Sequence, residues 1–470
     1  MSSEGLLDFI CLANSLGGRH YSFSKTKTFS SVSIDSRSVE QGALFVALSG
    51  EKTDGHCYVE DAFKAGAAAA IVESSKLATH KLLEIAETSQ KELIAVENTL
   101  RALQDTAKIY LDKFPKLVKV GITGSSGKTT TKEIAASIIG IEKNIVINKG
   151  NLNSETGLPL SVFAVREDHE VGIFELGMNR KGEIAELARV LTPNIALITN
   201  IGSAHIGILG SIKAIVEEKK NIFSLLKKSD IALIPGEDEY CNSLSEGLRC
   251  VIRFYSPDTF SELEEVRDLG LDGTEILWAG EKIHFALPGK HNLADALAAI
   301  AIAKELNVSN YAIKKGLEKA APLFGRQEIL KGRTTVIRDC YNANPQSMQK
   351  SLEFCDSLQW NNKRIYVIAD MLELGTVSQA AHEQLGLLLS ESKADMIFLF
   401  GKEIEAAAAV LNSKCKSFYY TNSIDELYAL LDSSVQNNDL VLLKGSRGCA
   451  LERLSEMLLG DSFREPHHVS

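Results

Sequence analysis

The residues best suited to chemistry form a glycine-rich stretch that follows a short apolar run at residues 117–122. Glycines allow backbone N–H groups to point at phosphate oxygens, and a helix beginning at the end of the stretch adds a positive dipole. Lys128 can neutralise charge on the β- and γ-phosphates, and the Thr129 hydroxyl can reach Mg²⁺. The pattern predicts a phosphate loop, against the alternative of an ordinary glycine-rich turn. Its members are Thr123, Gly124, Ser125, Ser126, Gly127, Lys128, Thr129 and Thr130.

Two further polar side chains follow predicted strands of the same region. Glu175 lies within the end of the apolar run 171–176, and His205 follows the run 195–199. Open α/β sheets bind ligands at the carboxyl ends of their strands, and a carboxylate beside a phosphate loop suits a hard cation such as Mg²⁺. The alternatives are an exposed or helix-capping glutamate and a histidine with a purely structural role.

The elements that must position these residues fall into three blocks, 1–115, 116–325 and 326–470. Three domains suit a chain of 470 residues, because about 150 residues per domain is typical. The first block mixes short strands with helices and predicts a small α/β domain. Its predicted strands are 31–34, 43–48 and 67–72, and its predicted helix is 58–64.

In the second block strands alternate with helices, which predicts βαβ units and a central parallel sheet of the P-loop ATPase type. Residues 250–287 interrupt the alternation, and their three short apolar runs predict an inserted β-meander. The predicted strands are 117–122, 171–176 and 195–199, and the predicted helices are 132–139, 182–190 and 292–306.

The third block alternates regularly and predicts a Rossmann-like, doubly wound α/β domain. It has no GxGxxG after a strand, so a dinucleotide site is not supported. The predicted strands are 334–337, 364–369, 396–400 and 440–443, and the predicted helices are 346–355, 378–389 and 424–431.

Composition and charge exclude several classes of protein. The net charge is −10 with no dense basic block, which argues against nucleic acid as a partner. No stretch approaches the roughly 18 apolar residues of a membrane helix, so membrane insertion is not expected. The eight cysteines are scattered without a CxxC pair, which indicates neither zinc nor a disulfide framework. We expect a soluble, cytoplasmic protein.

Several motifs resemble those of the Mur ligases of peptidoglycan synthesis, over nearly the whole chain. They are TGSSGKTT at 123–130, GNLNSETGLP at 150–159, FELGMN at 174–179, TNIGSAH at 199–205, YNANP at 341–345 and DMLELG at 370–375. The loop is shorter than the common GxxxxGK[ST], which would need a glycine at Ile122. GKTT is similar to the Mur branch rather than to folylpolyglutamate synthases, and YNANP to members that add D-alanyl-D-alanine.

The resemblance implies roles around the nucleotide. Glu175 and His205 would help to hold a second Mg²⁺, and Lys219 would take the place of a lysine that CO₂ converts to a carbamate. Arg326 would reach the nucleotide phosphates. The sequence departs from the family at Arg338, where an aspartate is typical, and at Lys220 and Asn221 beside Lys219. The candidates for contact with the ATP base and ribose are Asn292, Asn342 and Asn344, with turn-forming asparagine as the alternative.

Substrate contacts are implied in all three blocks. In the first, Ser36 and Arg37 belong to a segment that resembles the family's uridine-nucleotide domain, although Asp-Ser-Arg is also common turn chemistry. In the second, Asn151 and Asn153 belong to the 150–159 motif. In the third, Arg447 lies in a loop after strand 440–443, where a helix N-terminus could bind a carboxylate. The alternative for Arg447 is a plain helix cap.

The implied activity is that of an ATP-dependent ligase with two Mg²⁺ ions and an acyl-phosphate intermediate. Its implied substrates are UDP-N-acetylmuramoyl-tripeptide and D-alanyl-D-alanine, and a monomer is expected. The alternatives are another Mur ligase, a folylpolyglutamate synthase-like ligase, or a nucleotide-binding relative without catalysis. Retention of Lys128, Glu175, His205 and Lys219 together argues against the non-catalytic alternative.

Overall fold

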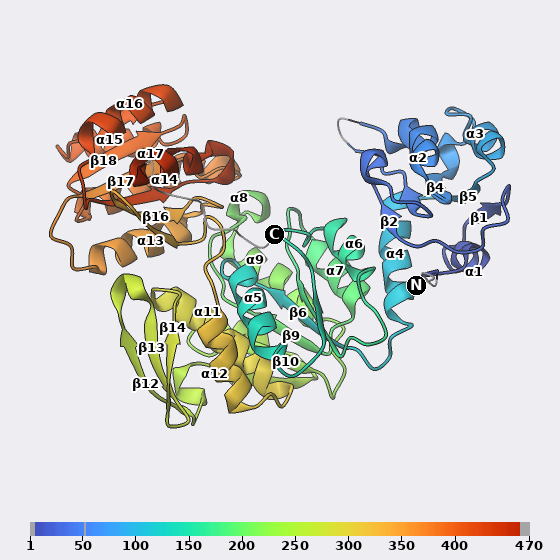
Figure 1. The fold of residues 1–470 in the computed structure, drawn as a ribbon, viewed down its shortest axis with the longest axis horizontal. Coiled ribbons are helices and arrows are strands. Elements are labelled where there is room, and N and C mark those ends of the chain that lie inside the picture. The colour runs from blue at the N-terminus through green and yellow to red at the C-terminus, as the bar shows by residue number, and fades with distance from the viewer. Residues whose placement is uncertain (1–4, 51–52, 461–470) are drawn as a thin grey trace. The chain divides into compact units, whose positions relative to one another are not determined.

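The computed structural model describes residues 5–50 and 53–460 (Figure 1). The chain forms two compact units, each of which is described by itself. The first contains the chain up to residue 121 with 144–178 and 182–194, and the second contains 122–143, 179–181 and the chain from 195 onward. No helix in the described part of the chain is long and apolar enough to cross a membrane.

A five-stranded mixed sheet forms the N-terminal part of the first unit. Its strands are β1 (Arg19–Tyr21), β2 (Val32–Ser33), β3 (Leu44–Val46), β4 (Ala69–Glu73) and β5 (Glu92–Val96). They lie in the order β1-β5-β4-β3-β2, and only β1 pairs antiparallel. The predicted strands 31–34, 43–48 and 67–72 are thus confirmed as β2, β3 and β4, while β1 and β5 were not predicted.

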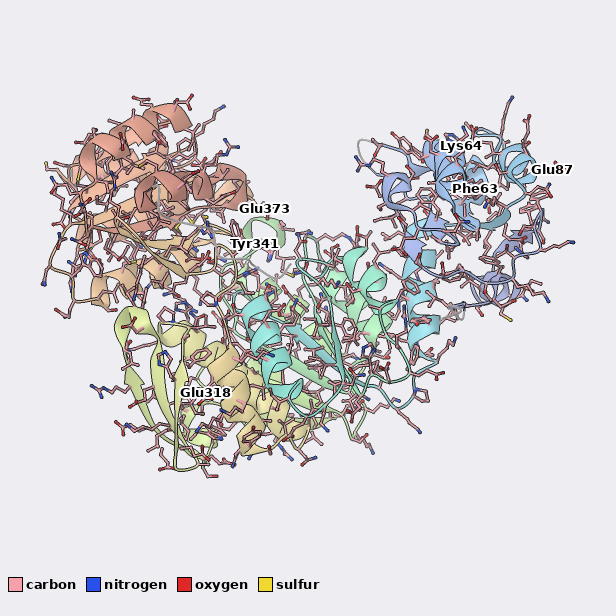
Figure 2. The ribbon with its side chains drawn as sticks, viewed as in Figure 1. Phe63, Lys64, Glu87, Glu318, Tyr341 and Glu373 are labelled. Atoms are coloured by element: carbon pink, nitrogen blue, oxygen red, sulfur yellow. The ribbon has the colours of Figure 1, made fainter. Side chains whose placement is uncertain are left out.

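Three short helices accompany this sheet: α1 (Phe9–Ser15), α2 (Val59–Ala65) and α3 (Leu82–Ser89). Two neighbouring residues of α2, labelled in Figure 2, show how its two faces differ. Phe63 is buried in the hydrophobic core with Phe45 and Leu93. Lys64 is exposed and pairs with Glu60 one turn earlier. One apolar and one polar stripe at helical spacing explain why residues 58–64 predicted a helix.

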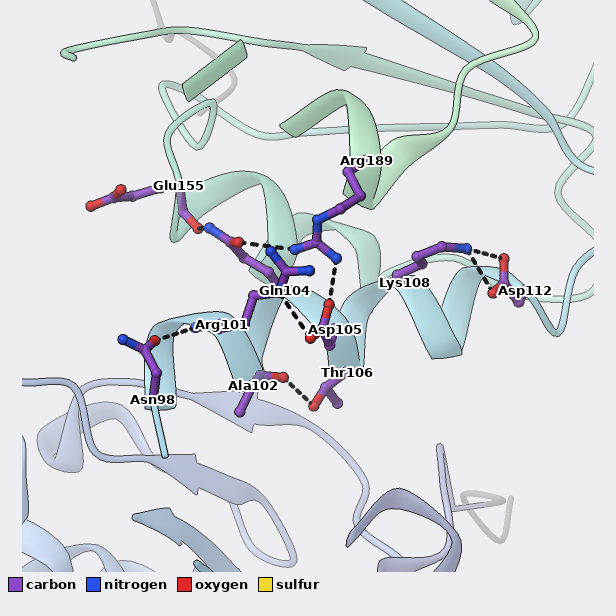
Figure 3. Close-up of polar contacts among 10 residues, drawn as sticks. All are labelled: Asn98, Arg101, Ala102, Gln104, Asp105, Thr106, Lys108, Asp112, Glu155 and Arg189. Atoms are coloured by element: carbon purple, nitrogen blue, oxygen red, sulfur yellow. Dashed lines mark hydrogen bonds and ion pairs between the residues drawn. The ribbon is translucent and has the colours of Figure 1, made fainter. Parts of the chain in front are cut away.

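A longer helix, α4 (Thr99–Leu111), packs against α6 (Gly157–Val162) and α7 (Glu183–Leu191). It begins at Asn98, whose side chain accepts a hydrogen bond from the Arg101 N–H (Figure 3). On the face toward α7, Asp105 pairs with Arg189, and Gln104 contacts both Arg189 and the Glu155 carbonyl (Figure 3). These polar contacts join segments that are about 50 to 85 residues apart in sequence, so no local pattern predicts them.

The central sheet carries the predicted phosphate loop. Its strands are β6 (Val118–Thr123), β7 (Ile145–Ile147), β8 (Val171–Glu175), β9 (Ile195–Ile198), β10 (Ile231–Pro235) and β11 (Val251–Tyr255). They lie in the order β11-β10-β9-β6-β8-β7. Within it β7 pairs with β8, β9 with β10 and β10 with β11, each time in parallel. The strands predicted at 117–122, 171–176 and 195–199 are confirmed.

Six further helices belong to this region of the chain. They are α5 (Lys128–Ile139), α8 (Ile206–Leu209), α9 (Ile212–Lys220), α10 (Cys241–Ser245), α11 (Lys290–Glu305) and α12 (Asn310–Lys319). α5 begins four residues before the predicted start at 132, directly after Gly127. Its neighbours α11 and α12 pack along it.

The predicted β-meander is partly wrong. β12 (Leu263–Asp268), β13 (Thr274–Trp278) and β14 (Glu281–Phe285) do form a three-stranded antiparallel sheet. The first predicted run, however, is β11, which pairs in parallel with β10 at the edge of the central sheet. An apolar run of five residues specifies a strand but not its partner, because pairing depends on residues far along the chain.

The C-terminal sheet is doubly wound, as predicted. Its strands are β15 (Glu328–Lys331), β16 (Thr335–Asp339), β17 (Arg364–Ala369), β18 (Met396–Phe400), β19 (Tyr419–Thr421) and β20 (Leu440–Lys444). The order is β15-β16-β20-β17-β18-β19, with only β15 antiparallel. The helices are α13 (Pro345–Ser357), α14 (Ser378–Glu391), α15 (Glu405–Ser413), α16 (Ile424–Ser434) and α17 (Ser455–Leu459).

Alternate residues of β17 show how both faces of this sheet are covered. Tyr366 and Ile368 lie in a core with α13, α14 and α15, whereas Ile365 and Val367 lie in a second core with α16 and α17. Successive side chains of a strand point to opposite faces, so a continuous apolar run is needed when helices cover both. That run is what made 364–369 recognisable in the sequence.

Candidate active site

The phosphate loop lies where the sequence placed it, between the end of β6 and the start of α5. Two glycines are required by its geometry. Gly124 has a φ of +155°, and a Cβ there would lie 1.8 Å from Thr199 Oγ1. Gly127 has a φ of +78°, and a Cβ there would lie 2.0 Å from Asp295 Oδ1. Neither position could hold a side chain without moving its neighbours.

The segment after β9 holds the phosphate loop in place. Thr199 Oγ1 donates to the Ser126 carbonyl at 2.6 Å, and Asn200 Nδ2 donates to the same carbonyl at 3.0 Å. Asn200 Oδ1 in turn accepts from the Ser126 N–H at 3.2 Å. Ser125 Oγ exchanges hydrogen bonds with the backbone of Gly202. Thr199 and Asn200 were noted only as part of a motif, and the structure assigns them this supporting role.

Lys128 and Lys219 converge on one backbone oxygen. Lys128 Nζ donates to the Gly124 carbonyl at 2.9 Å, and Lys219 Nζ, from α9, donates to the same carbonyl at 2.8 Å. Lys219 is buried, with 1% of its surface exposed. Burial, and after it the charge of Lys128, holds the pKa of Lys219 well below its ordinary value. The alternative of a solvated helix lysine is therefore wrong for Lys219.

His205 follows β9 in a left-handed backbone conformation, with φ +65°. Such a φ is uncommon for a residue with a side chain and indicates a local constraint. Burial lowers the pKa of its imidazole to about 3, and the charges of Lys219 and Lys128 add to the effect. The ring is therefore neutral at physiological pH and retains a nitrogen lone pair for a ligand.

Glu175 belongs to the first unit and is the last residue of β8, the strand next to β6 in the sheet. Its side chain is 2% exposed, and its Oε1 accepts a hydrogen bond from Asn153 Nδ2 at 2.7 Å. The Glu175 N–H donates to Asn148 Oδ1 at 2.9 Å, a contact that the sequence did not predict. An exposed or helix-capping role for Glu175 is excluded. Asn151 is exposed on the same loop.

The start of α11 lies against the phosphate loop through Asp295, whose carboxylate occupies the space beside Gly127. One turn earlier, Asn292 is buried, and its Nδ2 donates to the Pro288 carbonyl and to Gln327 Oε1. Asp295 and Gln327 were not predicted as site residues. Asp295 stands three positions after Asn292, which is the spacing of one helix face and the only signal that could have found it.

We expect Asp295→Asn to stabilise the protein above pH 7. Burial raises the pKa of Asp295 to about 7, although Lys350 and Arg326 oppose the rise. The folded state therefore holds a proton that the unfolded state loses near pH 4, so wild-type stability falls between about pH 4 and 7. The gain in the free energy of unfolding from asparagine should grow over that window to a few kcal/mol, since each pH unit contributes about 1.4 kcal/mol, and then stay constant.

Denaturant midpoints measured from pH 5 to 8 test this expectation, with the exposed Asp432→Asn as the matched control. A gain that is independent of pH would show that Asp295 carries its ordinary charge in the folded protein.

Arg326 and the YNANP segment lie together at the start of the C-terminal sheet. The Arg326 guanidinium stacks over the Tyr341 ring at 4.3 Å, and the Tyr341 N–H donates to the Gly325 carbonyl at 2.9 Å. Asn344 caps α13, its Oδ1 accepting from the Ser347 N–H at 2.9 Å. This contact matches the turn-forming alternative for Asn344. Asn342 is exposed, and its Oδ1 accepts from the next backbone N–H.

Arg338, which stands where an aspartate is typical of the family, forms a buried ion pair. Arg338 is fully buried, and its Nε lies 2.8 Å from Glu328 Oε2 on the neighbouring β15. Its guanidinium stacks over the Phe324 ring at 4.4 Å. The next residue, Asp339, pairs with Lys444 Nζ at 2.9 Å at the end of β20. The local charge is thus compensated inside the C-terminal sheet.

The residues predicted to contact substrates show mainly local partners. Arg447 begins a 3₁₀ helix of three residues, with its Nη1 3.0 Å from Glu452 Oε1. A helix so short supplies little dipole, so the argument that a helix N-terminus binds a carboxylate there is weak. In the first unit, Asp35 caps the 3₁₀ helix that contains Ser36 and Arg37, and the Arg37 side chain is 88% exposed and paired with Asp35.

The donor chemistry fits Mg²⁺, although among residues 5–50 and 53–460 no group of three or more His, Cys, Asp or Glu could hold a metal ion. Thr129 offers a hydroxyl at the first turn of α5, and Glu175 a carboxylate oriented by Asn153. Hard oxygen donors of this kind suit Mg²⁺, which usually completes its sphere with phosphates and water.

Comparison with known proteins gives a consistent assignment. Three family profiles match: "Mur ligase family, catalytic domain" at residues 28–110, "Mur ligase middle domain" at 122–303 and "Mur ligase, glutamate ligase domain" at 325–447. The UDP-N-acetylmuramoyl-tripeptide–D-alanyl-D-alanine ligase of Treponema pallidum is 42% identical over 96% of this chain and 98% of its own length.

Solved structures agree. MurF from Acinetobacter baumannii is 29% identical with a TM-score of 0.86, over 98% of this chain and 100% of that one. MurF ligase from Thermotoga maritima in complex with ADP is 27% identical with a TM-score of 0.75, over 91% and 96% of the two chains. With these likenesses along nearly all of its length and an intact phosphate loop, the chain belongs to the Mur ligase family.

Proposed function

We propose that this chain joins D-alanyl-D-alanine to UDP-N-acetylmuramoyl-tripeptide at the expense of ATP. The observation that carries the proposal is the phosphate loop with two lysines on the Gly124 carbonyl, in a chain 42% identical to a ligase of that name. The chain is an ATP-dependent Mur ligase that forms an amide bond. The identity of its two substrates is the proposal.

The reaction proceeds in two steps. The terminal carboxylate of the tripeptide attacks the γ-phosphorus of ATP, the bond to the β,γ-bridging oxygen breaks, and ADP leaves. The dipeptide amine then attacks the acyl carbon, the C–O bond to phosphate breaks, and the amine loses a proton. Lys128 and Arg326 stabilise the negative charge on the transferring phosphoryl group. No protein nucleophile is needed.

Two Mg²⁺ ions are part of the proposal and supply further positive charge at the phosphates. Thr129 would bind one ion through its hydroxyl, and Glu175 and His205 would bind the second. The neutral imidazole of His205 and the buried carboxylate of Glu175 support these roles.

Lys219 is proposed to act as a carbamate. Carbamylation requires a neutral amine, and the lowered pKa of Lys219 supplies one. The product is an anion, and it would lie beside the Lys128 ammonium, because both side chains reach the Gly124 carbonyl. An anion at this position would also support Mg²⁺.

Each block is proposed to take one part of the reaction. Residues 1–115 bind the UDP-substrate with Ser36 and Arg37, and 116–325 bind ATP, with Asn151 and Asn153 contacting substrate. Residues 326–470 bind the dipeptide and complete the nucleotide site. We place Asn292, Asn342 and Asn344 near the ATP base and ribose. A monomer acting in the cytoplasm is proposed.

For Arg447, we expect Arg447→Ala to raise the KM for D-alanyl-D-alanine about tenfold or more, since a charge-assisted contact contributes roughly 1.5–3 kcal/mol. The KM for ATP should not change. The exposed Arg453→Ala, on the following turn, is the control. An unchanged KM for the dipeptide would leave Arg447 with only its contacts to Glu452 and Phe324.

Release of phosphate from ATP tests the proposed function. With UDP-N-acetylmuramoyl-tripeptide present, steady release should require D-alanyl-D-alanine and should not be supported by single amino acids such as D-glutamate or lysine. Release driven by a single amino acid would assign the chain to another branch of the family.

A further inference from the structure

Two glycines from distant segments of the second unit face each other. Gly207 belongs to α8, two residues after His205, and Gly375 begins the 3₁₀ helix Gly375–Val377 after β17. A Cβ on Gly207 would lie 2.1 Å from the Leu374 carbonyl oxygen, and a Cβ on Gly375 would lie 3.5 Å from the Gly207 carbonyl oxygen. The backbones of the central and C-terminal sheets' loops thus touch without any intervening side chain.

A second contact lies on the other side of His205. A Cβ on Gly202 would lie 2.1 Å from Oε1 of Gln346, in the first turn of α13. Gly202 is also the residue whose backbone exchanges hydrogen bonds with Ser125 of the phosphate loop. The C-terminal part therefore meets the segment 202–207 at both of its ends, and His205 lies between the two contacts.

The backbone has an uncommon conformation at His205 and close to the contact at Leu374. His205 has a φ of +65°. Glu373, which is labelled in Figure 2, directly precedes Leu374 in the chain and also has a φ of +65°. Left-handed backbone at residues with side chains persists only where the surroundings hold it. Here α8, which follows His205, is held by its contact with the 3₁₀ helix at Gly375.

We propose that Gly207 and Gly375 are positioning residues: seating of the C-terminal part on α8 fixes the 202–207 segment, and through it the His205 ring and the Ser125 loop. The inference rests on the proposed function for the role of His205. The contact itself does not depend on that function. A side chain at position 207 would hold the two backbones apart and leave the phosphate loop able to bind nucleotide but unable to complete the site.

Gly207→Ala is the decisive substitution. Alanine is favoured over glycine in a helix by about 1 kcal/mol, and the φ of Gly207 is compatible with a side chain, so α8 itself should not be weakened. We expect kcat to fall about 100-fold, as displacements near 1 Å can cause, with the KM for ATP within twofold of wild type. Amide hydrogen exchange of residues 203–209 and 372–377 should accelerate at least tenfold, in the protein without ligands.

Four further variants complete the design. Gly236→Ala is the matched control, because a Cβ there meets nothing closer than 3.6 Å. Gly202→Ala should lower kcat only slightly, because the atom that its Cβ would meet is the end of the flexible Gln346 side chain. When Gln346→Ala removes that side chain, adding Gly202→Ala should leave kcat within twofold of the Gln346→Ala protein.

The readouts separate the possible failures. Unchanged hydrogen exchange in Gly207→Ala would overturn the docking contact, and accelerated exchange with an unchanged kcat would overturn the positioning role. If the wild-type protein formed no peptide bond, the proposed function would fail while the exchange measurement still decided whether the contact exists.

Discussion

Lys128→Ala is expected to reduce ligation at least 1,000-fold while leaving the fold intact. Removing one charge-stabilising donor from a preorganised site costs about 10²–10³ in kcat, and here the lost group also donates to the Gly124 carbonyl of the phosphate loop at 2.9 Å. The side chain is only partly buried, so its loss removes little packing. Circular dichroism and the thermal midpoint should match those of wild type.

The exposed Lys228→Ala is the control for the loss of one positive charge from the same part of the chain. Substantial ATP-dependent ligation by a folded Lys128→Ala protein would remove the phosphate-loop assignment.

The second large effect concerns Lys219. Lys219→Ala should lose at least 99% of activity and regain a measurable part of it when short carboxylic acids such as acetate or propionate are added. The reason is chemical: a small carboxylate can enter the space left by the side chain and supply the anionic oxygens of the proposed carbamate. The buried position of Lys219 beside the Gly124 carbonyl makes a confined space for that anion.

Lys220→Ala is the matched control, because its Nζ donates to the Ser243 and Glu246 carbonyls, away from Gly124. It should keep its activity and should not respond to carboxylic acids. A Lys219→Ala protein that remains fully active without any additive would end the carbamate proposal, and one that is rescued equally by amines would point to a lost cation instead.

The parts of the site that are formed by residues adjacent in the chain could be predicted from the sequence. A strand, a glycine-rich loop and a helix are adjacent in the chain, so the pattern predicts both the element and its chemistry. Even the error at α5 is local: the helix begins at Lys128 because Gly127, at φ +78°, ends the loop directly before it. The apolar run that predicted the helix starts only later, at Ile134.

Contacts between residues that are far apart in the chain could not be predicted from the sequence. Asp295 reaches Gly127 from a helix that begins more than 160 residues later, and Gln327, directly before β15, accepts a hydrogen bond from Asn292 in α11. β11 was assigned to the wrong sheet because a five-residue run does not specify its partner. Arg338 is paired with Glu328 on the adjacent antiparallel strand, a partner that its own motif does not contain. In each case the deciding contact depends on the tertiary fold.

The most direct test of the proposed reaction is the mass of its product. The protein is incubated with ATP, Mg²⁺, D-alanyl-D-alanine and UDP-N-acetylmuramoyl-tripeptide, with lysine, diaminopimelate or ornithine as the third residue in parallel reactions. We expect UDP-N-acetylmuramoyl-pentapeptide from at least one of them, with one ADP and one phosphate per peptide bond, and none when the dipeptide is omitted. Consumption of ATP with a product carrying one added amino acid, or with no peptide product from any of the three, would contradict it.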